Sequence, residues 1–235
     1  MHRFSLVAGV FAAAALALAA VPAAAQNLVS NPSFESPVLT PGNVTQDTIP
    51  GGWTGQASGG FGYGVSYEAG ILLTPNGTQW AFTNNQGATG SIAQQTAKTV
   101  VAGATYTLTA EVGLRTDTTA ATGTSIQLWS GGTVANGVVT GGTMVASQPI
   151  VQSSGAFVSG TASWVGTAPQ AGQLLTVRLL TTGASGQTGW DNVSLTEALP
   201  PVPPVPTLSE WAMILVGLML AGTAVLLVQR RKLEA

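Results

Sequence analysis

The 235-residue chain contains no cysteine, and its single histidine is His2, close to the amino terminus. Without cysteine the chain can form no disulfide, no thiolate nucleophile and no cysteine-bound metal site. Beyond His2 it also lacks the residue that serves in Ser-His-Asp triads, as the commonest general base and as a zinc ligand. Catalysis, if present, would therefore have to depend on carboxylates, tyrosine, lysine or arginine.

Charge is scarce as well, since Asp, Glu, Lys and Arg make up 7% of the chain against about 25% in an average protein. Between Gln26 and Ala198 the only cations are Lys98, Arg115 and Arg178. A segment so poor in cations is a poor nucleic-acid binder, and we expect no nucleic-acid partner. The seven acidic residues of this segment show no spacing that singles out a catalytic pair, so we expect that the protein is not an enzyme.

Residues 1–25 have the organisation of a secretory signal peptide. Arg3 precedes an alanine-rich apolar run, and the small residues Ala23-Ala24-Ala25 provide a cleavage site. We therefore expect the Sec translocon and signal peptidase to act on this segment. The mature protein would then begin at Gln26.

A second apolar stretch covers residues 211–228 and carries no charge. As a helix of about 18 residues it would be roughly 27 Å long, which is enough to cross a bilayer core. Trp211 suits the membrane interface at one end, and a basic cytoplasmic tail of Arg230, Arg231 and Lys232 would stop transfer at the other. Residues 199–206 contain five prolines and are expected to form an extended linker before this helix.

The residues at the start of this stretch resemble a carboxy-terminal sorting signal of Gram-negative bacteria, the Ile-Pro-Thr-Leu-Ser-Glu-Trp variety. The matching residues are Val205, Pro206, Thr207, Leu208, Ser209, Glu210 and Trp211, with valine replacing the first isoleucine. The resemblance implies an exosortase-type processing enzyme as a partner of residues 207–235. It also implies export, transient anchoring in the inner membrane, and delivery to the cell surface or extracellular matrix. The alternative is an ordinary membrane anchor.

The mature segment, residues 26–198, consists of short stretches in which apolar and polar side chains alternate. In residues 105–112, Tyr106 and Leu108 face one way while the threonines face the other. Similar stretches occur at residues 79–83, 91–95, 125–129, 157–165, 175–179 and 189–195. Glycine- and asparagine-rich turns separate them. This pattern predicts an all-β fold, an antiparallel jelly roll or β-sandwich ectodomain, followed by a single C-terminal transmembrane helix.

Segments of this domain resemble galactose-binding-like jelly rolls, which include many carbohydrate-binding modules. They are residues 27–35, 49–53, 91–95 with 103–108, and 190–195. The resemblance implies that Glu35 and Asp191, from the opening and closing strands, share a structural calcium ion. The alternative is that both carboxylates are solvated or cap turns through backbone N–H groups.

Exposed aromatic rings are the candidate contacts for a polysaccharide, because their faces stack on sugar rings. The candidates are Trp53, Tyr63 and Tyr67, whereas Trp80 and Trp129 lie inside alternating strands and are expected in the core. Taken together, these features predict a non-catalytic surface or matrix protein that binds glycans. The alternatives are a purely structural or adhesive protein without a specific ligand, and a carbohydrate-active enzyme with paired carboxylates.

Overall fold

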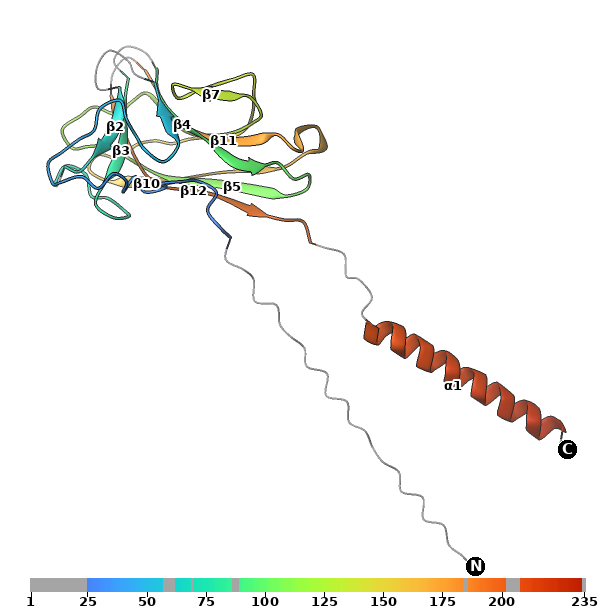
Figure 1. The fold of residues 1–235 in the computed structure, drawn as a ribbon. Helices are drawn as coiled ribbons and strands as arrows, with labels where there is room; N and C mark the ends of the chain where they lie inside the picture. Colours follow the sequence, from blue (N-terminus) through green and yellow to red (C-terminus); the bar gives the residue numbers. More distant parts are fainter. Residues whose placement is uncertain are drawn as a thin grey trace, which may run out of the picture. The chain divides into compact units, whose positions relative to one another are not determined.

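The computed structural model describes residues 25–56, 62–68, 70–85, 89–183, 186–201 and 208–233. Two compact units divide between Ala198 and Leu199. The first unit is built from antiparallel strands, and the second contains the helix α1 (Leu208–Leu233) (Figure 1). The described residues thus confirm the predicted antiparallel β-sandwich with one C-terminal helix.

Two five-stranded sheets form the sandwich. Sheet A has the order β10 (Phe157–Val165), β5 (Thr105–Gly113), β12 (Gln187–Ala198), β3 (Trp80–Asn84), β2 (Tyr63–Ser66). Sheet B has the order β1 (Trp53–Gly55), β4 (Thr89–Thr99), β11 (Leu174–Thr182), β6 (Gly123–Ser130), β9 (Thr143–Pro149). A short hairpin of β7 (Thr133–Ala135) and β8 (Val138–Thr140) lies between β6 and β9, and a 3₁₀ turn (Ala168–Gln170) precedes β11.

The core lies between the two sheets and follows from the alternation in the sequence. In β5 the residues that point to sheet B are at most 1% exposed: Tyr106, Leu108, Ala110 and Val112. They share one apolar cluster with side chains of β11 and β6, namely Leu175, Val177, Leu179, Ile126 and Leu128. Burying a side chain of this size contributes about 1.5–3 kcal/mol, so the strands are held mainly by this layer.

Hydrogen bonds join the start of the described chain to the last strand. The backbone N–H of Leu28 donates to the carbonyl of Leu195 at 2.8 Å. The side chain of Asn27 donates to the carbonyl of Val193 at 2.9 Å and accepts from the N–H of Leu195 at 3.0 Å. The opening and closing segments of the domain therefore lie side by side.

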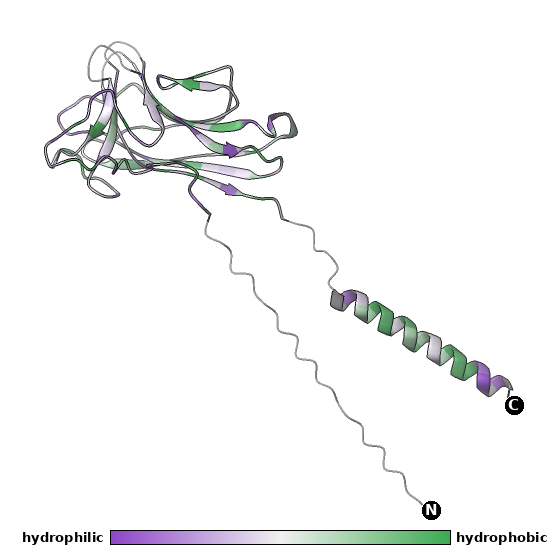
Figure 2. Ribbon diagram, viewed as in Figure 1, coloured by the Kyte–Doolittle hydropathy of each residue, from purple (hydrophilic) through white to green (hydrophobic). Residues whose placement is uncertain are grey.

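The helix α1 contains the one segment, among the described residues, that is long and apolar enough to cross a membrane. That segment is Glu210–Arg230, with a mean hydropathy of 2.4. Figure 2 shows hydrophobic residues along most of the helix and hydrophilic ones near its C-terminal end. The helix extends beyond the predicted residues 211–228 at both ends, because its backbone hydrogen bonding continues into the polar flanks.

Candidate functional site

The face of sheet A that points away from the core carries a strip in which aromatic residues, glycines and charged side chains lie together. This outer strip comprises Trp80, Phe82 and Asn84 of β3, Gln187, Gly189 and Asp191 of β12, Glu111 and Gly113 of β5, and Arg115 just after β5. Side chains of a strand alternate between faces, and the neighbours Ala81 and Trp190 lie in the core. Gly189 pairs with both Phe82 and Gly113, so three strands contribute to the middle of the strip.

An apolar slot lies on the middle of the outer strip. Its side chains form a cluster separate from the main core: Leu72, Trp80, Phe82 and Phe157. Leu72 comes from the connection between β2 and β3 and lies over two glycines of the strip. A Cβ atom built on Gly113 or Gly189 would be 2.8 Å from Leu72 Cδ2, so only glycine leaves room for this side chain. The glycines therefore turn a flat sheet face into a recess that holds an apolar group.

Asp191 is next to this slot and is completely buried. The register of β12 against β5 shifts after Asp191, and Asn192 has a left-handed φ of 47°. This bulge turns the N–H of Asn192 back onto the Asp191 carboxylate, at 2.6 Å. The other oxygen accepts from the backbone N–H of Asn76 at 3.2 Å.

Burial raises the pKa of Asp191 from 3.8 to about 7, and the negative charges of Glu35 and Glu111 add to the rise. The two backbone N–H donors act in the opposite direction but do not compensate for the burial. Asp191 is therefore present in both protonation states near neutral pH, unlike an ordinary carboxyl group. A carboxyl poised in this way can give a proton to a bound molecule and take it back.

Glu35 and Asp191 both accept hydrogen bonds from the connection between β2 and β3. The Glu35 carboxylate accepts hydrogen bonds from the N–H groups of Thr78 and Gln79, both at 2.8 Å. Gly77 permits this approach, because a Cβ atom there would lie 2.2 Å from Glu35 Oε1. The two residues predicted to share calcium thus act on neighbouring N–H groups of one turn. Among the described residues no group of three His, Cys, Asp or Glu side chains is placed to hold a metal ion.

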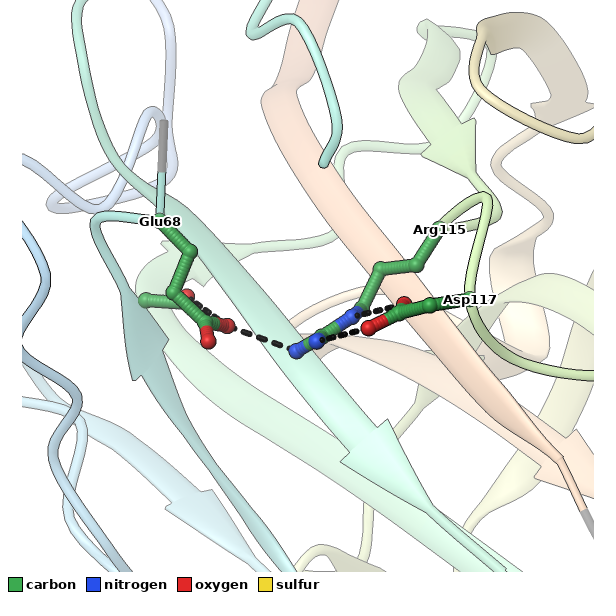
Figure 3. Close-up of polar contacts among 4 residues, drawn as sticks. Glu68, Arg115 and Asp117 are labelled. Atoms are coloured by element: carbon green, nitrogen blue, oxygen red, sulfur yellow. Dashed lines mark hydrogen bonds and ion pairs between the residues drawn. The ribbon is translucent and has the colours of Figure 1, made fainter. Parts of the chain in front are cut away.

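Arg115 lies at the end of the outer strip and binds two carboxylates (Figure 3). Its Nε and Nη2 donate to the two oxygens of Asp117 at 2.8 and 2.7 Å, and its Nη1 donates to Glu68 at 2.6 Å. Glu68 also accepts from the hydroxyl of Ser66 at 2.9 Å. The hydrogen bonds from Arg115 lower the pKa of Asp117, which is therefore ionised at neutral pH. Nothing in the sequence spacing pointed to the pair Arg115–Glu68, because 47 residues separate them.

A polar cavity of about 500 Å³ adjoins this ion-pair cluster. Its lining residues are Asn84, Arg115, Asp117, Thr118, Thr119, Gly186 and Gln187. Asn84, Gln187 and Arg115 also belong to the outer strip. The strip therefore presents a protonatable carboxyl near one end, an apolar slot in the middle and a polar cavity at the other end.

Of the tryptophans, Trp53 was the predicted sugar contact, and Trp80 and Trp129 were expected in the core. Trp53 is 5% exposed, packs against Phe34 at a centroid distance of 5.3 Å, and donates its indole N–H to the carbonyl of Ser30. Its faces are thus not open to a sugar ring. Trp80 is buried, as expected, but on the outer face of sheet A. Trp129 is half-buried and outside both core clusters, because it points away from the core of sheet B.

Tyr63 and Tyr67 are both half-buried. The hydroxyl of Tyr63 donates to the carbonyl of Asp47 at 2.7 Å. Its ring lines a second cavity, of about 540 Å³, together with Gln56 and Asn136. The structure does not bring Tyr67 to this cavity wall. The role of both tyrosines in glycan binding stays a prediction.

Only part of the sorting segment lies within the described residues. Glu210 and Trp211 are exposed in the first turns of α1, and Arg230 and Lys232 are exposed in its last turns. Leu208, Ser209 and Arg231 are also in this helix. The residues Val205, Pro206 and Thr207, and the signal-peptide residues 1–24, lie outside the described part.

Two family models match the chain. The HpiC1 cyclase model, HpiC1-like, matches residues 25–196, and the IPTL-CTERM motif matches residues 203–231. A search of curated proteins found no match.

Solved structures share the fold of the β-sandwich domain. A Stig cyclase from Fischerella sp. TAU, in complex with (3Z)-3-(1-methyl-2-pyrrolidinylidene)-3H-indole, has a TM-score of 0.64 and 22% identity over 76% of this chain and 100% of that one. A cyclase from the same organism, in complex with 4-(1H-indol-3-yl)butan-2-one, has a TM-score of 0.61 and 20% identity over 74% and 98%. The tandem CBM22 domain of Paenibacillus barcinonensis Xyn10C has a TM-score of 0.50 and 17% identity over 79% of this chain and 50% of that one. At these identities the likeness shows the fold alone.

The comparisons confirm two sequence-based predictions and overturn a third. The C-terminal motif is the predicted sorting signal, and with the apolar helix it fits export with a membrane anchor. The jelly-roll fold is shared with carbohydrate-binding modules, as the resemblance implied. The expectation that the protein is not an enzyme is wrong, because the family model that matches residues 25–196 is that of a cyclase.

Proposed function

The chain belongs to the HpiC1-like cyclase family, and from this premise we propose that its exported domain is a cyclase that uses Asp191 as proton donor and acceptor. The observation that supports this role is a buried carboxyl with a pKa of about 7 next to an apolar aromatic slot. Histidine is absent from the mature chain, so a carboxyl with a raised pKa is the group suited to proton transfer near neutral pH.

The proposed reaction begins with transfer of the Asp191 proton to an electron-rich atom of the substrate. The carbocation or iminium ion that results would face the rings of Trp80, Phe82 and Phe157, which attract positive charge. Attack by a nucleophilic carbon of the same molecule closes the ring, and loss of a proton to the Asp191 carboxylate restores the starting state. Proton transfer of this kind contributes about 10²–10⁴-fold to a rate.

A substrate reaches this site only after the connection between β2 and β3 moves. Leu72 fills the slot, and the N–H of Asn76 covers one oxygen of Asp191. Both residues belong to the same connection, so a single displacement would free the slot and the carboxyl together. Such segment movements commonly accompany substrate binding.

An indole-type compound is the proposed substrate class. The two Fischerella structures hold compounds with an indole ring. The slot here is lined by aromatic rings, with Trp80 and Phe82 at 67° to one another, which suits a flat aromatic molecule.

The test is turnover by the full-length chain, purified in detergent, with indoles that carry an unsaturated side chain. Cyclisation leaves the mass unchanged, so products are separated by chromatography and identified by NMR. Asp191→Asn should lower turnover at least 100-fold. Asp47→Asn, which changes an exposed carboxyl elsewhere, should leave it unchanged. Equal turnover by the wild type and Asp191→Asn would contradict the role of Asp191.

The proposed location follows from the sorting motif. An exosortase-type enzyme would recognise residues 205–211 after Sec-dependent export and removal of the signal peptide. The cyclase would then be processed from the inner membrane to the cell surface or extracellular matrix. Its substrate would be met outside the cytoplasm.

Glycan binding is a second candidate function, favoured by the cavity at Tyr63. A tyrosine ring beside the amide side chains of Gln56 and Asn136 combines a stacking face with hydrogen-bonding groups for hydroxyls. A glycan array of the full chain would test this, with Tyr63→Ala expected to lose the signal and Asp191→Asn to keep it. Tyr67→Ala tests the second predicted contact, which is half-buried and is not among the residues that line this cavity.

A structural calcium ion at Glu35 and Asp191 also remains a proposal, and the residues fit it in part. They supply two carboxylates, but each accepts hydrogen bonds from backbone N–H groups. Calcium takes six to eight oxygen ligands, so backbone carbonyls would have to supply the others. Calcium would also require ionised Asp191 and so would compete with the proposed proton transfer.

A further inference from the structure

The polar cavity at Arg115 lies on the outer strip at a distance from Asp191. Gln187, in its wall, and Asp191 are four residues apart on β12 and point to the same face. At about 3.4 Å per residue they are separated by about 14 Å. Gly189, under the apolar slot, lies between them. A molecule that reaches from Asp191 into the cavity must therefore be elongated, with an apolar middle.

The charges beside this cavity disfavour an anion as its ligand. One guanidinium, that of Arg115, faces two carboxylates, those of Glu68 and Asp117. Each of its three nitrogens already donates to a carboxylate oxygen. The cluster thus has a surplus of negative charge, and the side chain of Asp117 is 51% exposed. A positively charged group is the complementary partner.

Two atoms of the lining residues have unused hydrogen-bonding capacity. Thr118 Oγ1 and Gln187 Oε1 are buried, and neither has a hydrogen-bond partner among the described residues. Folded proteins leave few buried polar atoms in this condition. Both residues line the cavity, so these oxygens are acceptors available to a donor bound there.

We propose that this cavity binds a protonated nitrogen of the substrate, such as an ammonium or amidinium group. Asp117 supplies the charge, and Gln187 and Thr118 supply acceptors for the remaining N–H groups. This site depends on the proposed function, because the apolar slot holds the body of the same molecule. The substrate class is then an elongated aromatic amine that carries its positive charge far from the atom that Asp191 protonates.

Three probes with the same ring and different charges test this site: tryptamine, 3-ethylindole and indole-3-propionate. Their dissociation constants for the full chain in detergent are measured by calorimetry at low salt. A charged hydrogen bond to Asp117 should make tryptamine bind about 10-fold more tightly than 3-ethylindole. Indole-3-propionate should bind most weakly, and added salt should reduce the difference between the probes.

Two variants locate the charge recognition. Asp117→Asn should bring the affinity for tryptamine down to that for 3-ethylindole and leave 3-ethylindole unchanged. Thr118→Val removes a buried hydroxyl that has no partner among the described residues, so it should lower the affinity for tryptamine without loss of folding. Asp47→Asn is the control for loss of an exposed carboxyl. Thermal melting of each variant verifies that it is folded.

The outcomes separate this site from the proposed cyclase. Equal affinities for the three probes would contradict the cation site. A preference for tryptamine that is unchanged in both Asp117→Asn and Thr118→Val would also contradict it. Neither result would contradict the cyclase proposal. A preference lost in Asp191→Asn but not in Asp117→Asn would place the cation at the other end of the strip and would also overturn it. If no indole probe binds, the aromatic slot fails as a binding site, and both proposals fall.

Discussion

Asp191 should make the stability of the exported domain fall as the pH rises. Its pKa is about 7 in the folded protein and 3.8 in its ordinary state. The folded state therefore keeps a proton that the unfolded chain releases between these values. The stabilisation is complete below about pH 4 and is lost as the pH rises to about 7. A difference of this size corresponds to about 4 kcal/mol, at 1.36 kcal/mol per pKa unit.

The measurement is urea denaturation of the exported domain within the full chain, from pH 4.5 to pH 8 with a metal chelator present. The wild type should lose about 3 kcal/mol of unfolding free energy over this range, because the range begins above the ordinary pKa of 3.8. Asp191→Asn cannot ionise and should be nearly free of this loss, whereas the exposed-site control Asp47→Asn should behave as the wild type. The same pH dependence in all three proteins would refute a raised pKa at Asp191.

The same experiment tests calcium. An ion shared by Glu35 and Asp191 would bind the ionised carboxylates, so it would stabilise the protein more as the pH rises. Calcium at 100 times its dissociation constant would add about 2.7 kcal/mol at pH 8. Asp191→Ala should abolish this response. Denaturation curves that coincide with and without calcium at pH 8 would count against the ion.

Three further predictions follow from the slot and the two ends of the chain. Leu72→Ala should lower the unfolding free energy by about 2–5 kcal/mol in urea, yet strengthen indole binding by calorimetry, because it empties the slot. Pro206→Ala with Glu210→Ala should leave the protein inserted but unprocessed, as fractionation and mass of the released form would report; release at wild-type size would contradict the sorting role. Mass spectrometry of the exported protein should find Gln26 at its amino terminus, and an intact Met1 would disprove cleavage.

The sandwich could be predicted from the sequence because it follows from local alternation. The pattern of β5 identified Tyr106 and Leu108 as core residues, and both are fully buried. The pattern failed for Trp80, which is buried on the outer face of sheet A instead, and for Trp129, which is half-buried and outside both core clusters. A period of two separates the faces of a strand but does not say what covers each face. What covers a face depends on how the connections between strands fold, and here the connection between β2 and β3 places Leu72 over the outer face.

The site was harder to predict, because its properties arise from burial and long-range contacts. The resemblance to jelly rolls singled out Glu35 and Asp191, and the structure brings both to the same turn. Gly113 and Gly189 carry no chemical signal in the sequence, although they form the recess for Leu72.

The expectation of a protein without catalysis had a specific physical flaw. It required a pair of carboxylates at a suitable spacing, as in a glycosidase. A single carboxyl can act as acid and base if burial raises its pKa, and burial cannot be seen in the spacing of acidic residues. Asp191 is one of seven acids in the exported segment and differs from the others in its surroundings rather than its sequence context.

The scarcity of cations between Gln26 and Ala198 also bears on Asp191. A nearby lysine or arginine would favour its ionised form and lower its pKa. Arg115 belongs to the same strip, but Glu68 and Asp117 neutralise it, and no cation is among the causes that set the pKa of Asp191. Burial and the neighbouring acids Glu35 and Glu111 therefore raise the pKa of Asp191 without opposition from a cation. The ion-pair cluster at the other end of the strip bears on the proposed cyclase through its surplus carboxylate charge, which is available to a cationic group of the substrate.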